Sequence, residues 1–500
     1  DRDVGRLGDN LSYADNFVRS AILMGHEYAA EASLVLNVWM YAAHQLWKGL
    51  ETCQKMVEAD NPGQFNLGTA GMDEFIALWI GTGSNPGSPN GDSLYAMTED
   101  AYNEFGGVFE ESETNSELKS LYQQASSLLS IPGICTKAEQ PESPRMLYSI
   151  STQMLSKMQI PLIQQLILSI LNKDVRKTQV LAMAVVPQAA QCRPSAYKRL
   201  KDYLLLTENP RFDKTKIILR DLQDIYNCFG LTCDDIGEPP LKLTKNVDMP
   251  DCYASNPRSA LAQYFPSTDV ASVARVDLDI LQMRILSSMG SFRYAQMWYD
   301  YGRNSPVQQR SENDSFSYYS LADLAVASSR KNGDPWFSDF VLYHNDNNYA
   351  DKMMRNVLQG RNNKWNSVEQ RTAVIAETSA FMVVQMHLWA QINDAVNQCK
   401  GMQSEGEYDL THPWDEVAAL IIGSLEGTME GGSADLEDGQ LTWSLASRRA
   451  FQFQSINSDG YANINSRLED LLYAGKGEID AMECTALERT AYQIQVLTNS

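Results

Sequence analysis

Residues 31–53 read EASLVLNVWMYAAHQLWKGLETC, and residues 377–399 read ETSAFMVVQMHLWAQINDAVNQC. Both stretches carry apolar residues at a spacing close to 3.6, which is typical of a buried amphipathic helix. Each begins with a glutamate and ends with a cysteine 22 residues later, without a gap. The pair predicts long core helices of an all-α protein and indicates that one part of the chain occurs twice.

Further landmarks recur in the same order around the two stretches. They are Tyr13-Ala14-Asp15 with Arg19 and Tyr349-Ala350-Asp351 with Arg355, Asp73-Glu74 and Asp415-Glu416, Tyr95 with Phe105 and Trp443 with Phe453, and Asn115-Ser116 and Asn465-Ser466. Ordered self-similarity is the signature of a duplicated structural unit. We therefore expect a duplicated helical-bundle module in two lobes. The expected boundaries are 1–172 for the first copy, 173–260 for a connecting helical segment with a Pro-rich linker, and 261–500 for the second copy.

Helical spacing of apolar residues extends beyond the two core stretches, and no convincing alternating strand is present. Further helices are expected at 15–24, 72–80, 118–129, 150–171 and 270–289. Gly-rich stretches at 81–91 and 427–439 occupy matching places in the two copies and predict long surface loops.

The eight cysteines include no C-x-x-C pair, which favours disulfides over a zinc site. Repeat symmetry predicts one bridge within each copy, Cys53 to Cys135 and Cys399 to Cys484, at separations of 82 and 85 residues. The remaining Cys192, Cys228, Cys233 and Cys252 allow three pairings, and the sequence does not choose among them. Glycosylation triplets at Asn10 and Asn313 agree with secretion. We expect an extracytoplasmic, disulfide-stabilised glycoprotein whose signal peptide has been removed.

The net charge of −22, from 41 Lys plus Arg against 63 Asp plus Glu, disfavours nucleic acids and anionic lipids as partners. Such a surplus of carboxylates suits cationic ligands, although solubility alone also explains it. The most apolar windows, 30–47 and 373–392, contain several polar and charged residues. We therefore expect no membrane span within these residues.

One stripe of polar residues marks the long helix of each copy. At 100° per residue, Glu31, Tyr41 and Gln45 share an arc of about 80°. The corresponding residues of the second copy are Glu377, His387 and Gln391. Buried polar groups need partners, so the stripe predicts either an interhelical hydrogen-bond network or a site for a hard cation such as ferric iron.

Two carboxylate pairs, Asp73-Glu74 and Asp415-Glu416, are expected at the start of a helix. Helix capping accounts for one carboxylate of each pair. The second carboxylate is then available as a metal ligand or as the partner of a buried arginine.

The segment Arg303-Asn304-Ser305 follows two tyrosines and Gly302. A cation beside small polar donors is suited to an anion that binds next to a metal. The alternative is an ordinary helix end with Gly302 at the C′ position.

No catalytic machinery is recognisable. Five histidines are present without an H-x-x-x-H or H-E-x-x-H set, and G-x-S-x-G, G-x-G-x-x-G and G-K-[ST] motifs are absent from the sequence. We expect a protein that is not an enzyme.

Several segments resemble the algal low-iron-inducible periplasmic proteins, the iron-assimilation family that includes the diatom phytotransferrins. They are Trp414-Asp415-Glu416 leading to Gly423-Ser424-Leu425-Glu426-Gly427, Tyr301-Gly302-Arg303-Asn304-Ser305, Ile160-Pro161-Leu162-Ile163-Gln164, Val186-Pro187 with Cys192, and Tyr226 with Gly230-Leu231-Thr232-Cys233-Asp234. The resemblance implies a secreted, periplasmic or cell-surface protein that binds ferric iron, with carbonate in phytotransferrins, for uptake. A membrane-bound uptake partner would then receive the iron.

Repeat symmetry and ligand chemistry supply the candidate site residues. The predicted metal ligands are Glu31, Tyr41, Asp73, Glu74, Glu377, His387, Asp415 and Glu416, and the predicted anion site is Arg303, Asn304 and Ser305. The two copies differ in two places. Gly81-Thr82-Gly83-Ser84 of the first copy corresponds to a fuller loop in the second, and Tyr41 of the first copy corresponds to His387 in the second. Iron is expected to leave in acid, because protons compete for its ligands. The alternative is a structural or adhesive surface protein of the same fold.

Overall fold

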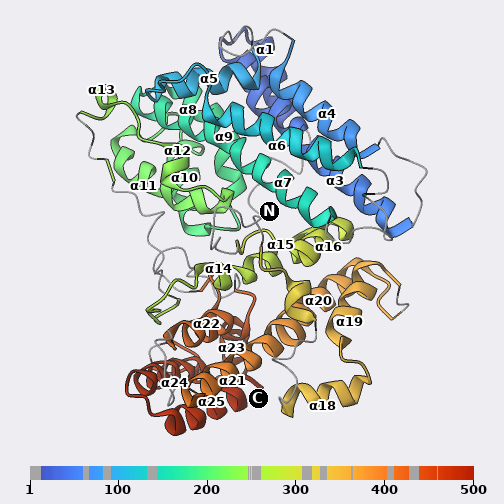
Figure 1. Cartoon of the computed structure of the whole chain (residues 1–500). Helices are drawn as coiled ribbons and strands as arrows, with labels where there is room; N and C mark the ends of the chain where they lie inside the picture. Colours follow the sequence, from blue (N-terminus) through green and yellow to red (C-terminus); the bar gives the residue numbers. More distant parts are fainter. Residues whose placement is uncertain are drawn as a thin grey trace. The chain divides into compact units, whose positions relative to one another are not determined.

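The structure, a computed structural model, consists of helices joined by loops (Figure 1). It describes residues 13–59, 67–82, 92–131, 134, 143–245, 247, 249–250, 261–306, 318–326, 335–361, 364–401, 410–426, 439–458 and 460–499. Within these ranges there is no β-strand, only isolated bridges such as that between Leu261 and Tyr264. The all-α class is confirmed.

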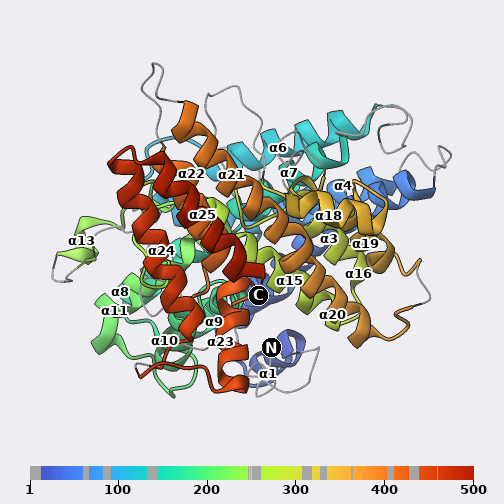
Figure 2. The ribbon, with the colours of Figure 1, turned by 90° about the horizontal axis from the view of Figure 1, so that it is seen from below.

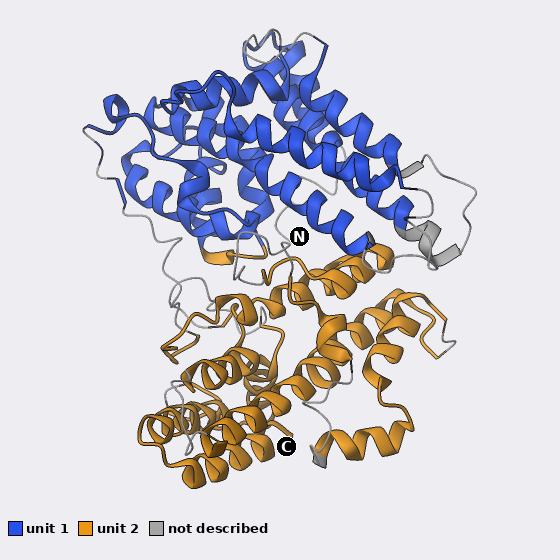
Figure 3. Ribbon diagram, in the orientation of Figure 1, with its two compact units in different colours: residues 1–190, 196–255 blue, residues 191–195, 256–500 orange. Residues whose placement is uncertain are grey.

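The chain forms two compact units (Figure 3). Unit 1 comprises residues 1–190 and 196–255, and unit 2 comprises residues 191–195 and 256–500. The boundary after residue 255 falls near the end of the expected Pro-rich linker. Most of the expected connecting segment belongs to unit 1, because its helices pack against α8 (Gln159–Leu171). These helices are α9 (Val175–Val185), α11 (Thr215–Tyr226) and α12 (Cys233–Ile236).

Unit 1 is a bundle around α8 (Gln159–Leu171), a predominantly apolar helix that is buried from Gln159 to Ile170, its few polar side chains included. The long helices α3 and α4 pack closely where Gly71 faces Gly49, and a Cβ on Gly71 would lie 2.9 Å from the Gly49 nitrogen. The helices of unit 1 are α1 (Tyr13–Leu23), α2 (Ala29–Ala32), η2 (Ser33–Val38), α3 (Trp39–Ala59), α4 (Leu67–Ile80), α5 (Leu94–Glu104), α6 (Glu113–Leu129), α7 (Ser143–Lys157), α8 (Gln159–Leu171), α9 (Val175–Val185), η3 (Val186–Ala189), α10 (Pro194–Leu204), η4 (Phe212–Lys214), α11 (Thr215–Tyr226), η5 (Asn227–Phe229), α12 (Cys233–Ile236) and α13 (Leu241–Thr244).

Unit 2 is organised around α22, which is buried from Val417 to Ile422 and packs against α14, α21 and α24. Trp414 on α22 lies against Gly475 of α24, where a Cβ would come within 2.0 Å of the indole ring. The helices of unit 2 are α14 (Ala271–Ala274), α15 (Val276–Ser288), α16 (Phe292–Tyr301), α17 (Leu321–Ala325), α18 (Pro335–His344), α19 (Tyr349–Leu358), α20 (Val368–Thr378), η6 (Ser379–Val384), α21 (Gln385–Gly401), α22 (Thr411–Ile422), α23 (Thr442–Phe453), α24 (Asn463–Asp480) and α25 (Cys484–Asn499).

The long helix of each unit contains one π-helical segment. In unit 1 it is η2, and in unit 2 it is η6. Both begin at the serine two residues after the repeated glutamate, Ser33 after Glu31 and Ser379 after Glu377. π-Helical turns are rare, so their occurrence at matching positions is informative.

Other contacts also recur at aligned positions. The Nδ2 atom of Asn115 donates to the carbonyl oxygen of Tyr95 at 3.1 Å, and Nδ2 of Asn465 donates to that of Trp443 at 3.0 Å. These four residues are the ones aligned by the sequence landmarks. In both units the asparagine therefore ties two helices together in the same way.

The repeated arginines pair with carboxylates. Arg19 Nε lies 2.7 Å from Asp15 in unit 1, and Arg355 Nε lies 2.9 Å from Asp351 in unit 2. Arg355 also contacts Asp300 of α16 at 2.8 Å. The unit 2 pair is therefore part of a larger and more buried ion-pair network.

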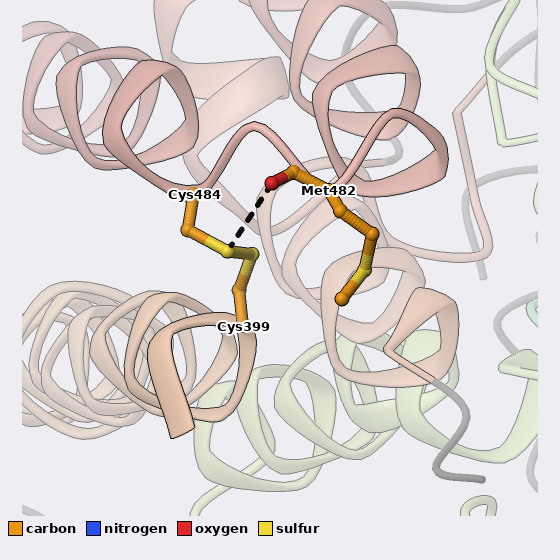
Figure 4. Close-up of a disulfide and its surroundings, with 3 residues drawn as sticks. All are labelled: Cys399, Met482 and Cys484. Carbon is orange, nitrogen blue, oxygen red and sulfur yellow. Dashed lines mark hydrogen bonds between the residues drawn. A yellow bond between two sulfur atoms is a disulfide. The ribbon is translucent and has the colours of Figure 1, made fainter. Parts of the chain in front are cut away.

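The predicted bridge between Cys399 and Cys484 is present (Figure 4). It joins the end of α21 to the start of α25, and these helices lie side by side in two views (Figures 1 and 2). Cys53 is also disulfide-bonded, but Cys135 lies outside the described residues, so their pairing stays a prediction. Asn10, Asn313, Cys252 and the loops 83–91 and 427–438 lie outside the described residues as well.

Two helical stretches, Pro144–Leu171 and Val368–Gly401, are long and apolar enough to cross a membrane by length and composition. Their most apolar windows are 83% and 61% buried within the protein, as expected of core helices. This is weak support for a membrane span.

Candidate functional site

The predicted ligands of the long unit 1 helix do not converge. Glu31 lies 3.5 Å from Lys177 of α9. Burial raises the pKa of Glu31, and the neighbouring ammonium of Lys177 opposes this rise. Tyr41 is 52% exposed, whereas Gln45 is only 1% exposed. The three side chains therefore have different surroundings.

The π-helical segments explain why the predicted stripe fails. A π-turn bonds residue i to i+5, so it holds about one residue more than an α-turn and shifts the helix phase by about 100°. Because η2 lies between Glu31 and Tyr41, these residues no longer share a face. The same shift at η6 separates Glu377, which is exposed, from His387, which is half-buried.

Asp73 and Glu74 do not stand at a helix start, because α4 begins at Leu67. The capping interpretation is therefore wrong for this pair, and it is also wrong for Asp415 and Glu416, because α22 begins at Thr411. Asp73 is exposed and accepts a hydrogen bond from the Tyr122 hydroxyl at 2.7 Å, which raises the pKa of Tyr122. Glu74 lies 3.8 Å from Lys48, with both side chains about half exposed. These carboxylates line no described pocket.

Asp415 is fully buried in unit 2 and serves as a structural acceptor. It accepts hydrogen bonds from the Tyr264 hydroxyl at 2.6 Å, Ser267 N at 2.7 Å, Thr268 N at 2.8 Å and Thr268 Oγ1 at 2.9 Å. Three of these bonds go to Oδ2 and one goes to Oδ1, so both oxygens of the carboxylate are used within the protein. Burial and the bond to Asp415 raise the pKa of Tyr264 well above its ordinary value. Asp415 thus holds residues 264–268 against α22.

Glu416, the next residue, faces a different set of partners. Its side chain is 12% exposed, and its Oε1 lies 3.4 Å from Nε2 of His412, one turn earlier on α22. Gln391 of α21 donates from Nε2 to the Oε2 atom of Glu416 at 2.5 Å. His412 also contacts the Thr268 hydroxyl through Nδ1 at 3.1 Å. The structure therefore brings together Glu416, which was a predicted ligand, Gln391, which belongs to the predicted polar stripe, and His412, which was not predicted.

The spacing of His412 and Glu416 suits two ligands of one ion. Ligand atoms that each lie about 2.1 Å from a metal at right angles are about 3 Å apart, close to the observed 3.4 Å. Among the described residues, no group of three or more His, Cys, Asp and Glu side chains is placed to hold a metal. A metal here would therefore take only these two protein ligands of that kind, leaving coordination positions for an anion or water.

Unit 1 has no equivalent of this pair. By the repeat alignment Glu74 corresponds to Glu416, Gln45 to Gln391, and Ala70 to His412. Lys48 places an ammonium near Glu74 instead. The two units therefore differ at this position as well as at Tyr41.

The predicted anion site is already used by a carboxylate. Asp279 of α15 accepts from Arg303 N at 3.3 Å, from Asn304 N at 3.1 Å and from Asn304 Nδ2 at 2.7 Å. Burial raises the pKa of Asp279 to about 7, against the opposing effect of these bonds. Ser305 is buried, and its hydroxyl has no hydrogen-bond partner among the described residues. Gly302 ends α16 with a φ of 68°, so the helix-end interpretation fits this segment.

Asp277, also on α15, binds the segment that follows α22, Gly423-Ser424-Leu425. It accepts from Ser424 Oγ at 2.7 Å and Leu425 N at 2.9 Å. Burial raises the pKa of Asp277 to about 6. Gly423 has a φ of 83°, and a Cβ there would lie 2.4 Å from Asp277 Oδ2, so this contact requires glycine.

No family model, no curated protein and no solved structure matches this chain. We therefore infer its function from the residues themselves.

Sequence reasoning did not single out His412, Asp277 or Asp279. His412 and Glu416 stand four residues apart on one helix, a spacing that could have identified the pair. Asp277 and Asp279 lie in an apolar helical pattern that offered no sign of the loops they bind. Their roles depend on contacts between segments more than 20 residues apart.

Proposed function

We propose that the chain is an extracytoplasmic protein that binds ferric iron for uptake, and that unit 2 holds the ion through His412 and Glu416. The supporting observation is the 3.4 Å separation of their ligand atoms on one face of α22. A carboxylate and an imidazole are donors that bind iron. Gln391 fixes the orientation of Glu416 by its hydrogen bond, as groups that hydrogen-bond to metal ligands do in metalloproteins.

Carbonate is the proposed synergistic anion. Two protein ligands leave coordination positions open, and a bidentate oxyanion would fill two of them while neutralising part of the charge of the ion. The donors of Arg303 and Asn304 that contact Asp279 are not free for this role. We therefore place carbonate on the metal itself.

An oxidising compartment is the proposed location. The Cys399 to Cys484 bridge is present, and no cysteine within the described ranges is a free thiol. Disulfides of this kind persist outside the cytosol. A binding protein at the cell surface would deliver its iron to a membrane-bound uptake partner.

We also propose that the two units are copies of one module. The matching π-helical segments support this, as do the Asn115 and Asn465 bonds at aligned positions. Contacts that depend on backbone register are difficult to reproduce by chance. Because Lys48 stands near Glu74 in the first copy, we expect one iron site for each chain, in unit 2.

A structural surface protein is the second candidate. The observation that favours it is that Asp415, a predicted metal ligand, accepts four hydrogen bonds from the protein itself and so has a structural role. Under this alternative His412 and Glu416 form only an ion pair between two positions of one helix.

Titration with ferric citrate in bicarbonate buffer tests the proposal. After dialysis, elemental analysis should find one iron for each chain, and lowering the pH should release it because protons compete for the ligands. The double variant H412A/E416Q should retain no iron. Glu74→Gln is the matched control, because it removes the aligned carboxylate of unit 1 and should leave iron binding unchanged.

Two results would contradict the proposal. One is a wild-type protein that retains no iron under these conditions. The other is a variant H412A/E416Q that retains as much iron as the wild type while keeping its helical circular dichroism spectrum.

A further inference from the structure

Unit 1 contains a pocket of about 590 Å³ that none of the predicted ligands lines. Its wall is formed by the end of α5, the loop after it, the start of α6, Lys157 at the end of α7, α8 and residues 232–237. This volume is in the range of sites for small organic molecules and is far larger than a single ion needs. Two segments of the family resemblance, 160–164 and 230–234, contribute to the wall.

The charge of the wall is negative. Four carboxylates, Glu113, Glu117, Asp234 and Asp235, face one cation, Lys157. The Lys157 ammonium lies 2.8 Å from Glu117 and 3.0 Å from Asp235. Burial lowers the pKa of Lys157, but these two carboxylates outweigh that effect and raise it. The pocket therefore already accommodates one ammonium group between two carboxylates.

The other two carboxylates are available to a ligand. Glu113 and Asp234 are exposed and form no ion pair with any other residue that the structure describes. They add two negative charges at the pocket wall beyond the Lys157 pair. A cation that enters would meet them without displacing a protein partner.

Two largely buried residues at the wall have side-chain oxygens that no described protein group uses. Gln164 is 8% exposed, and its Nε2 donates to Ile236 O at 2.9 Å, while its Oε1 accepts no bond from the described residues. The hydroxyl of Thr114, a residue that is 9% exposed, likewise has no side-chain bond in that part of the chain. Neither oxygen is among the fully buried atoms that lack a partner, so water reaches both, and a ligand that carries N–H donors can take the place of that water.

An aromatic wall completes the pocket. The Tyr102 hydroxyl accepts hydrogen bonds from Val108 N and Phe109 N, each at 3.2 Å, which hold the ring in place. Gly107 lies against the same ring, because a Cβ there would come within 2.2 Å of it. Phe105 lines the pocket beside Tyr102. Aromatic faces attract ammonium groups and pack against alkyl chains.

We propose that this pocket binds a small organic polycation of the polyamine class. Its ammonium groups contact Glu113 and Asp234 and donate to Gln164, and its alkyl chain packs along Tyr102 and Phe105. A metal ion fits less well, because it would leave most of the volume and the aromatic wall unused. The pocket lies in unit 1, so this inference is independent of the iron site proposed for unit 2.

Isothermal titration calorimetry with spermidine tests the proposal on the full, metal-free chain at low ionic strength. Spermidine should bind one site, and butylamine, with one ammonium, should bind more weakly. The double variant Glu113→Gln with Asp234→Asn should bind spermidine about tenfold more weakly, since two charge-assisted contacts are lost. The variant H412A should bind spermidine as the wild type does, which separates this test from that of the iron site.

A matched control is the double variant Glu104→Gln with Glu110→Gln. It removes two nearby carboxylates that lie outside the pocket wall, and it should change spermidine affinity less than about twofold, as expected for screened surface charges. The proposal is overturned if spermidine does not bind, if both double variants lose affinity equally, or if Mg²⁺ binds as tightly and is lost in the same variant.

Discussion

Replacing Asp415 by alanine should destabilise unit 2 strongly. The carboxylate is fully buried and accepts four hydrogen bonds, so the substitution strands the hydroxyl of Tyr264, which is itself buried. Ser267 is exposed, so water can replace its lost bond. Charge-assisted bonds contribute about 1.5 to 3 kcal/mol each, and a stranded buried donor costs about 1 to 3 kcal/mol. With water replacing part of the set, we expect a loss of about 4 kcal/mol in unfolding free energy.

Urea unfolding followed by circular dichroism measures this loss. The matched control is Asp73→Ala, because Asp73 is the aligned carboxylate of unit 1, is exposed and accepts one bond, from Tyr122. The control should cost less than about 1 kcal/mol, as surface substitutions usually do. Equal effects of the two substitutions, or a loss below about 1 kcal/mol for Asp415→Ala, would refute the structural role given to Asp415.

Three further predictions concern pH, covalent linkage and packing. Burial raises the pKa of Asp277 to about 6 and that of Asp279 to about 7, so their contribution to stability is fully present below the unfolded pKa and is lost as pH rises through these values. Denaturation of Asp279→Asn at several values between about pH 5 and pH 8 should show a flatter pH dependence than the wild type; an unchanged slope would count against it. Replacing Cys399 and Cys484 by serine should lower the unfolding free energy by about 4 kcal/mol, because the bridge closes a loop of 85 residues; a midpoint that does not move would contradict this. Gly107→Ala should cost about 1 to 3 kcal/mol, since its Cβ would overlap the Tyr102 ring, and it should weaken spermidine binding; a neutral effect on both would be inconsistent with the pocket described here.

The all-α class and the bridge between Cys399 and Cys484 were the most predictable features. Apolar spacing in residues 31–53 and 377–399 fixes the long core helices, and the bridge between Cys399 and Cys484 follows from repeat symmetry. These predictions depend on local periodicity and on the comparison of one half with the other. They require no knowledge of which helices pack together.

The candidate site was less predictable, for a specific physical reason. The helical projection assumed 100° per residue, and a π-helical segment between Glu31 and Tyr41 invalidates it. Local sequence preferences do not predict a π-helical segment, because packing in the folded unit selects it. The partners of Asp415 were hidden for a similar reason, since they lie about 150 residues away in the chain.

The expected anion site was mispredicted because the sequence does not show which acceptor its donors bind. Arg303, Asn304 and Ser305 have the composition of an anion-binding segment, but Asp279 takes the two backbone N–H groups and the Asn304 amide. Composition identifies donors, whereas only the fold shows which acceptor reaches them. His412 and Glu416, in contrast, are four residues apart in the sequence, so their proximity on one helix could have been predicted.

The most direct test of the central claim is X-ray absorption spectroscopy at the iron edge on protein loaded with ferric iron and bicarbonate. Outer-shell scattering from one imidazole should be present in the wild type and absent from His412→Ala, because His412 is the proposed nitrogen ligand. Iron bound without an imidazole, or an imidazole signal that persists in His412→Ala, would contradict the assignment of the site to α22.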